Sequence, residues 1–198
     1  MKKSLAALVL AAAVVVTGCS AQQAPNPPAA SAPAASAPAA QGDVLASLGL
    51  AGLSGRQVVE KLDQDPSQRP LQMKASVRPD HVVIGNGQAE TTLPITGDKP
   101  FYLSIAPYAS QTHECYFHSL ATCRGEMANR PVHVRITDSA GAVLVDEATT
   151  TYANGFVGFW LPRDISGTVT VTADGKAGTV PFATGPEDAT CLTTLKVS

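Results

Sequence analysis

The clearest pattern in the sequence is an alternation of apolar and polar residues in its C-terminal half. At residues 132–137, Val132, Val134 and Ile136 alternate with polar side chains, which predicts a strand with one buried face. Similar short runs recur at a spacing of roughly ten residues. Turn sequences separate them at 138–141, 154–155, 164–167 and 174–175. This pattern predicts a mainly-β, sandwich-like domain over residues 98–198.

A different pattern near the N-terminal end predicts a short helix. Ser54 and Gln57 have the spacing of a capping box, and Leu53 can pack on Val58 as a hydrophobic staple. The helix should end before Asp65-Pro66, because proline cannot continue it.

Three strand-like runs follow this helix, at residues 71–77, 81–84 and 89–95. The last two flank Asn86-Gly87, a strong hairpin sequence. Residues 44–97 should therefore form a small helix-plus-antiparallel-sheet domain, and the fold class is α+β. So short a domain has a thin core, so we expect it to dock on a neighbour or to form a homodimer.

The first residues have the features of an exported lipoprotein. Lys2 and Lys3 precede an apolar run, and Cys19 follows a small residue in Val16-Thr17-Gly18-Cys19. Residues 1–19 are thus predicted to be a lipoprotein signal peptide, with an ordinary cleaved signal peptide as the alternative. Lipidation at Cys19 would anchor the protein to a membrane. The cell envelope is the predicted location, on the periplasmic side where there are two membranes and on the outer face where there is one.

Residues 20–43 contain five prolines within an Ala-Pro-Ala-Ala-Ser pattern, which predicts a disordered tether. Charge adds little to this picture. The chain has 14 Lys and Arg against 16 Asp and Glu and carries no basic patch, so we expect no nucleic-acid partner.

Candidate chemistry is concentrated in the connection between the predicted strands 101–107 and 132–137. It exceeds 20 residues, whereas loops beyond about 12–15 residues are usually functional or disordered. It carries Cys115 and Cys123, whose spacing is too wide for them to share an ion on one continuous helix. If the loop folds back, both could meet Cys191, which precedes a predicted final strand at 192–197.

Three thiolates favour Cu(I), which prefers soft ligands, whereas Zn(II) would require a fourth ligand. His118 is the first candidate for an auxiliary ligand, ahead of His113 and Met127, although a solvated histidine or a core methionine is an alternative for each. His81 and His133 should face solvent. The thiols could instead form one structural disulfide and leave one free cysteine. The sequence lacks Cys-x-x-Cys, Gly-x-Ser-x-Gly and His-Glu-x-x-His motifs, which argues against classical hydrolase chemistry.

Three stretches of the sequence resemble the CueP-type periplasmic copper-binding proteins. They are Cys115-Tyr-Phe-His-Ser-Leu-Ala-Thr-Cys123-Arg-Gly-Glu-Met127, Asn154-Gly-Phe-Val-Gly-Phe-Trp-Leu-Pro-Arg163 and Thr190-Cys-Leu-Thr-Thr194. They occur in the same order and spacing as in that family. The resemblance implies an N-terminal part similar to the dimerisation domains of periplasmic disulfide isomerases, followed by a β-rich metal-binding domain.

The same resemblance implies that Cys115, Cys123 and Cys191 are the metal-binding and redox residues. It further implies copper resistance through retention of Cu(I), reduction of Cu(II), and copper supply to a Cu,Zn superoxide dismutase. Zinc is the alternative metal. A thiol-disulfide oxidoreductase without Cys-x-x-Cys and a non-catalytic sandwich module are the alternative functions.

Overall fold

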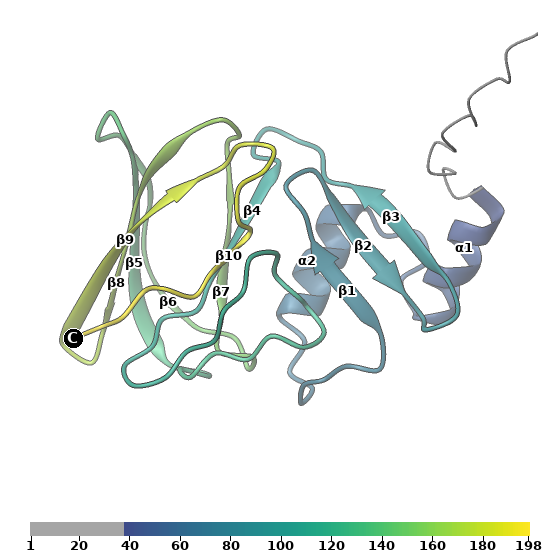
Figure 1. The fold of residues 1–198 in the computed structure, drawn as a ribbon, viewed down its shortest axis with the longest axis horizontal. Coiled ribbons are helices and arrows are strands. Elements are labelled where there is room, and N and C mark those ends of the chain that lie inside the picture. The colour runs from purple at the N-terminus through teal and green to yellow at the C-terminus, as the bar shows by residue number, and fades with distance from the viewer. Residues whose placement is uncertain (1–37) are drawn as a thin grey trace, which may run out of the picture. The chain divides into compact units, whose positions relative to one another are not determined.

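The computed structural model describes residues 38–198, in which two helices and ten strands form (Figure 1). The helices are α1 (Pro38–Ser47) and α2 (Gly55–Asp63). The strands are β1 (Lys74–Val77), β2 (His81–Gly85), β3 (Glu90–Pro94), β4 (Phe101–Ile105), β5 (Pro131–Asp138), β6 (Val143–Thr150), β7 (Val157–Leu161), β8 (Ser166–Ala173), β9 (Lys176–Ala183) and β10 (Cys191–Leu192). The predicted signal peptide, Cys19 and residues 20–37 lie outside the described residues. The α+β fold class is confirmed.

Helix α2 begins and ends as its sequence predicts. Ser54 caps it, and the backbone N–H of Ser54 donates to Gln57 Oε1 at 2.9 Å while Gln57 N–H donates to Ser54 Oγ at 3.3 Å. The apolar stripe of Val58, Val59 and Leu62 is fully buried against the sheet.

Helix α1 corrects the predicted boundary of the tether. It begins at Pro38, inside the segment assigned to the tether, because its alanine-rich sequence favours a helix and Val44 and Leu45 have a core to enter. Gln41 Nε2 donates to the carbonyl of Thr92 at 2.9 Å, which fastens α1 to strand β3.

The first sheet has the order β1-β2-β3 and is antiparallel throughout. Strand β1 starts at Lys74 rather than at the predicted residue 71, because Leu71 N–H instead donates to the carbonyl of Ala121 at 2.9 Å. The free edge of β1 is covered by the long loop: Val77 N–H donates to His118 O at 2.8 Å, and Leu120 N–H donates to Ala75 O at 3.0 Å. The loop thus acts as a partial fourth strand.

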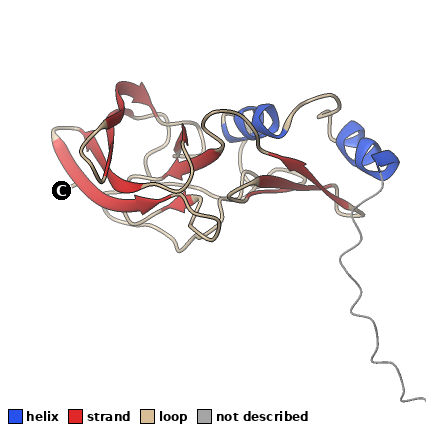
Figure 2. Ribbon diagram, turned by 90° about the horizontal axis from the view of Figure 1, so that it is seen from above, coloured by secondary structure: helices blue, strands red, loops and turns tan. Residues whose placement is uncertain are grey.

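The C-terminal region consists of two sheets, β10-β4-β7 and β6-β5-β8-β9, which enclose a common apolar core (Figures 1 and 2). Val132, Val134 and Ile136 of β5 are buried in this core, as the alternating pattern predicts. The sandwich-like architecture is confirmed.

The core of the N-terminal region does not close on itself. Tyr102 of β4, Leu120 and Ala121 of the long loop and Trp160 of β7 pack against α2 and the first sheet. The indole N–H of Trp160 also donates to Glu60 Oε1 at 2.8 Å. The thin N-terminal core is therefore completed by docking on the sandwich.

The predicted final strand at 192–197 is wrong. Strand β10 contains only Cys191 and Leu192 and runs parallel to β4. The ladder is interrupted beside Pro107, which has no N–H to donate, and it resumes only as a single parallel bridge between Tyr108 and Lys196. As a consequence, Cys191 lies within a strand rather than before one.

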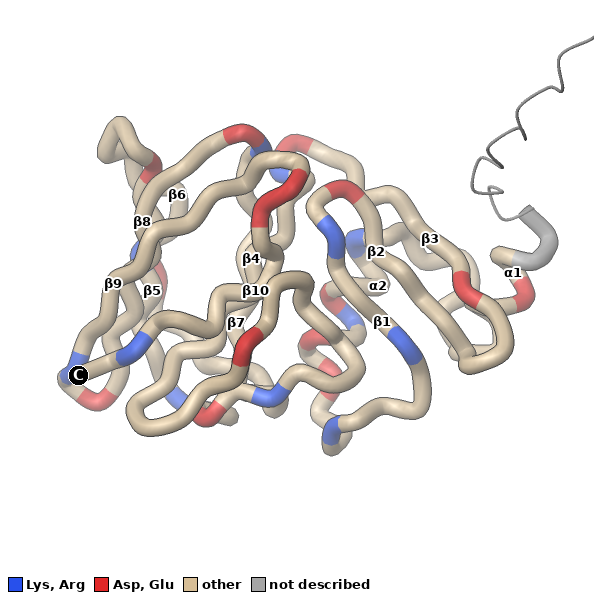
Figure 3. Tube along the Cα trace, viewed as in Figure 1, with Lys and Arg blue, Asp and Glu red and all other residues tan. Residues whose placement is uncertain are grey.

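Acidic and basic residues are interspersed along the described chain (Figure 3). Neither α1 nor α2 is long and apolar enough to cross a membrane.

Candidate metal centre

The loop between β4 and β5 folds back on itself and brings Cys115 and Cys123 together. A helical turn, in which Cys123 N–H donates to Ser119 O at 3.1 Å, reverses the direction of the chain. The two sulfur atoms lie 3.4 Å apart, and the backbone N–H of Ser119 donates to Cys123 Sγ at 3.4 Å. The predicted return of the loop is confirmed.

Cys191 reaches the same place from the other end of the chain. It pairs with Ser104 in the parallel β10–β4 ladder, and its N–H donates to the carbonyl of Tyr116 at 3.1 Å. The sandwich sheet and the long loop therefore both fix its position.

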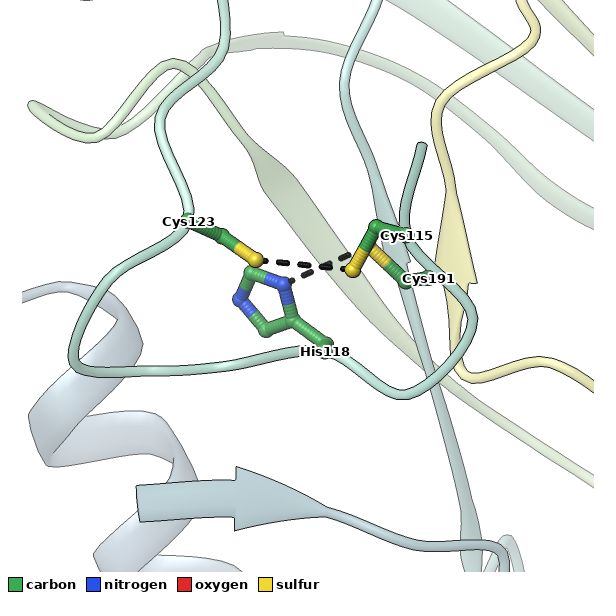
Figure 4. A group of neighbouring side chains, drawn as sticks. All are labelled: Cys115, His118, Cys123 and Cys191. Carbon is green, nitrogen blue, oxygen red and sulfur yellow. Dashed lines mark hydrogen bonds between the residues drawn. The ribbon is translucent and has the colours of Figure 1, made fainter. Parts of the chain in front are cut away.

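His118 is fully buried and is the fourth member of the cluster. Its Nδ1 lies 3.7 Å from Cys191 Sγ (Figure 4). Its Nε2 lies 2.9 Å from Asp63 Oδ1. The Nδ1 atom and the sulfurs of Cys115, Cys123 and Cys191 all lie within 4.8 Å of one another. The structure thus unites the three predicted cysteines with the first candidate for an auxiliary ligand.

The spacing of these four atoms suits a single metal ion. Tetrahedral coordination with metal–sulfur bonds of about 2.3 Å places neighbouring sulfurs about 3.8 Å apart. The closest pair here is 3.4 Å apart and no ligand atom is more than 4.8 Å from another. All three cysteines are free thiols in the structure, so each sulfur is available as a ligand.

Asp63, the last residue of α2, holds the outer nitrogen of His118. Its carboxylate is fully buried and also accepts hydrogen bonds from Tyr102 Oη at 2.7 Å, Asn154 Nδ2 at 2.7 Å and Ser104 Oγ at 3.3 Å. Asp63 is not among the site residues predicted from the sequence. A signal for it exists, because Asp63 falls four residues after Val59 and therefore on the apolar stripe of α2, where a carboxylate needs partners.

Thr190 fixes the backbone of His118. Its buried hydroxyl accepts from His118 N–H at 3.0 Å and donates to the carbonyl of Val77 at 2.8 Å. This residue joins the end of β1, the loop and the approach to β10 at one point. It too was missed, because nothing in the sequence places Thr190 beside His118.

The electrostatics of the cluster favour a thiolate at Cys123. Hydrogen bonds from Cys115 and Cys191 lower the pKa of Cys123 well below the ordinary thiol value, despite its burial. Hydrogen bonds with Cys115 and Cys123, together with burial, raise the pKa of Cys191. Burial opposes a charge on His118, but the Asp63 carboxylate raises the His118 pKa well above its usual range. Between these two buried sulfurs, the shifts favour the thiolate on Cys123 over that on Cys191.

Two close backbone contacts support the segment that follows Cys123. Gly125 N–H donates to Asn154 O at 2.7 Å, and Gly155 has φ +83° with its α-carbon packed directly on the Gly125 backbone. Glu126 accepts hydrogen bonds from the Ser110 hydroxyl and from the backbone N–H groups of Ser110 and Ala109, at 3.0 and 2.7 Å, and these bonds lower its pKa to about 2. The Glu126 contacts tie the two arms of the loop together, and the Gly125 contacts hold the loop against the connection between β6 and β7.

The other candidate residues lie outside the cluster. Met127 packs against the sandwich core, so it is a core residue, as the alternative interpretation of this methionine predicts. His113 packs edge-on against Phe156, with ring centroids 6.1 Å apart. His81 pairs with Asp80 and His133 with Asp146 at partly exposed positions.

Access to the cluster is unequal among the cysteines. Cys123 is 8% exposed and Cys191 3% exposed, whereas Cys115 is half-buried. Cys115 also lines a cleft of about 330 Å³ together with Tyr108, Thr112, His113, Glu114, Thr193 and Thr194. An ion would therefore reach the centre past Cys115.

These features define an α+β protein with a largely buried Cys₃His cluster suited to a soft metal ion. A family model described as "Periplasmic copper-binding protein CueP" matches residues 57–196. The chain therefore belongs to the CueP family of periplasmic copper-binding proteins, which is consistent with export.

The crystal structure of S.CueP is similar, with a TM-score of 0.76 and 45% sequence identity. The alignment covers 79% of this chain and 96% of that one. A comparison with curated proteins finds no match.

Proposed function

We propose that this protein sequesters Cu(I) in the cell envelope through Cys115, Cys123 and Cys191 and thereby contributes to copper resistance. The observation that carries the proposal is the convergence of three free thiols, with His118, within 4.8 Å of one another. Thiolates are the ligands that Cu(I) prefers, and a preformed set of three leaves little chain ordering to oppose binding.

The test is an anaerobic titration of the reduced protein with Cu(I) in competition with a chromophoric chelator. Each Cys→Ser variant should bind at least about 100-fold more weakly, since loss of a mere hydrogen-bond partner of a ligand already costs 10–100-fold. Met127→Leu is the matched control and should bind as tightly as the parent. Unchanged affinity in Cys191→Ser would refute the three-thiolate site.

The proposal includes reduction of Cu(II) as a second activity of the same site. Two thiolates would each give one electron to one Cu(II), forming one disulfide and two Cu(I) ions. The sulfurs of Cys115 and Cys123, 3.4 Å apart, can approach the S–S bond length of about 2.05 Å with a small movement. An external thiol reductant would have to regenerate the pair.

This activity is measured by adding Cu(II) without oxygen in the presence of a Cu(I)-specific chelator. We expect two Cu(I) ions for every two thiols lost, and peptide mapping would identify the disulfide. Formation of Cu(I) with all three thiols intact would contradict the mechanism.

Two partner assignments belong to the same proposal. The cleft beside the half-buried Cys115 would allow a recipient to approach the bound ion, and the family resemblance suggests a Cu,Zn superoxide dismutase as that recipient. Mixing the Cu(I)-loaded protein with the copper-free dismutase should restore dismutase activity, and Cys115→Ser loaded to the same level should restore it at a different rate.

A homodimer through residues 44–97 would place two such centres in one particle, and light scattering measures its mass.

The lipid anchor at Cys19 is the remaining part of the proposal. Its support is the lipobox sequence, in which Cys19 follows Gly18. Cys19→Ser should abolish incorporation of a labelled fatty acid and release the protein from membranes, while the Cu(I) affinity stays unchanged.

A further inference from the structure

Cu(I) and Zn(II) require different numbers of the four ligand atoms in the cluster. Cu(I) is satisfied by two or three soft sulfur ligands, whereas structural Zn(II) is almost always bound by four ligands in a tetrahedron. The three sulfurs would complete a Cu(I) site alone. A Zn(II) site requires a fourth donor, and among the described residues His118 Nδ1 is the donor within 4.8 Å of all three sulfurs.

His118 can serve as that donor only while its ring is held in one orientation. Its Nδ1 faces the sulfurs (Figure 4). Its Nε2 faces Asp63 Oδ1 at 2.9 Å. A carboxylate in this position accepts a hydrogen bond from Nε2–H, so when a metal ion displaces the proton from Nδ1, the lone pair of the ring lies on Nδ1, toward the metal. Such a carboxylate both fixes the tautomer and makes the ring a stronger donor.

Asp63 is itself held as an anion by its surroundings. Its charge is fully buried, and its ionic partner in the described part of the chain is His118. The remaining contacts to its carboxylate are neutral donors, from Tyr102, Asn154 and Ser104. The network extends from helix α2 through Asp63 and His118 to the sulfurs.

We propose that Asp63 is a positioning residue that sets the selectivity of the centre, because it holds His118 as the ligand that Zn(II) requires and Cu(I) does not. This inference rests on the proposed Cu(I) site. Asp63, a residue outside the cluster, would thus set the relative affinity of the centre for Zn(II) and Cu(I).

The central experiment compares two affinities in Asp63→Asn. Asparagine keeps the size of the side chain but removes its charge. Zn(II), titrated against a chromophoric chelator, should bind about 10–100-fold more weakly, the usual cost of losing the partner of a metal-ligating histidine. Cu(I) affinity should fall by less than about threefold, because the three sulfurs remain.

Two further variants separate positioning from general damage. Tyr102→Phe removes a hydrogen bond to Asp63 Oδ2 without touching the Oδ1–His118 contact, and should leave both affinities near those of the parent. His118→Gln should lose Zn(II) binding at least as strongly as Asp63→Asn. In the double variant, the Asp63 substitution should have almost no additional effect, because the two residues act as one unit.

The unsubstituted protein gives an independent measurement that requires no variant to fold. The ¹⁵N chemical shifts of His118 should show Nδ1 bound to the metal in the Zn(II) complex. Co(II), as a spectroscopic substitute for Zn(II), should give the intense visible bands of a tetrahedral site. In Asp63→Asn that is folded and saturated with Co(II), these bands should weaken, and under those conditions a loss of stability alone would not produce the change.

The outcomes are distinguishable. Equal losses of Zn(II) and Cu(I) affinity in Asp63→Asn, or no loss of either, would overturn the selectivity role of Asp63. A Zn(II) complex in which His118 Nδ1 is not ligated would overturn it without any variant. Failure of the parent protein to bind Cu(I) tightly would instead refute the proposed function.

Discussion

Substitution of Gly155 by alanine should weaken both the fold and the copper site. Gly155 has φ +83°, a conformation that costs an L-residue roughly 1–2 kcal/mol. An added Cβ would also lie 2.4 Å from Gly125 O, so the backbone would have to move, and such overpacking typically costs about 1–3 kcal/mol. We therefore expect a total destabilisation of roughly 2–5 kcal/mol.

Gly141→Ala is the matched control for this prediction. Gly141 has nearly the same φ, +87°, but an added Cβ would meet nothing within 4 Å. It should lose only the conformational term of about 1–2 kcal/mol. Urea denaturation measures both values, and Tm should fall by about 2–4 °C for each kcal/mol in a folded unit of this size.

The Gly155 substitution should also reach the metal centre. Gly125 follows Cys123 by two residues, so a displaced Gly125 shifts the Cys123 sulfur, and Cu(I) affinity should fall in Gly155→Ala but not in Gly141→Ala. Equal destabilisation by the two substitutions, with unchanged Cu(I) affinity in both, would refute the role given to the Gly125–Gly155 contact.

Three further predictions concern the groups around the centre. Thr190→Val leaves His118 N–H without its 3.0 Å acceptor and removes the donor to Val77 O, so the free energy of unfolding should fall by about 1–3 kcal/mol. Thr170→Val loses an exposed hydrogen bond to Thr179 and should change the free energy of unfolding by less than about 0.5 kcal/mol. Equal effects of the two substitutions would contradict the argument. The Glu126 carboxylate has a folded pKa lowered from 4.5 to about 2, so its stabilisation is fully present above pH 4.5 and is lost as pH falls through 2. In denaturation curves, the stability difference between the parent and Glu126→Gln should therefore shrink over that pH window. A stability difference independent of pH would show that the charge is irrelevant. Cys115 should be alkylated by iodoacetamide faster than Cys191, because Cys115 is half-buried while Cys191 is 3% exposed with a raised thiol pKa, and peptide mass spectrometry after brief labelling measures the order.

Local sequence patterns predicted the elements with local causes. The capping box at Ser54, the hairpin at Asn86-Gly87 and the alternation at 132–137 each depend on neighbouring residues, and each is present in the structure. The predicted continuous strand at 192–197 is wrong because its pairing with β4 is interrupted beside Pro107, a residue distant in sequence. Helix α1 was missed because proline and alanine content favoured a disordered tether, whereas Val44 and Leu45 find a core only in the folded protein.

The cysteines of the candidate site were predicted from the sequence, but their supports were not. A surplus thiol and an unusually long loop indicated chemistry at Cys115 and Cys123. Asp63 and Thr190 could not be placed beside His118, because those contacts span 55 and 72 residues of sequence. Tertiary structure alone brings them together.

The parallel pairing of β10 with β4 has a consequence for the order of events during folding. Cys191 joins the ladder opposite Ser104, across a connection that contains five other strands of the fold. Such non-local pairing forms slowly, because the chain loses the entropy of closing a long loop before the stabilising contacts between the strands can form. An incompletely folded chain would thus present Cys115 and Cys123 without their third sulfur, open to oxidation or to stray metal ions. Tight binding of one copper ion would then indicate that the whole chain has reached its native state.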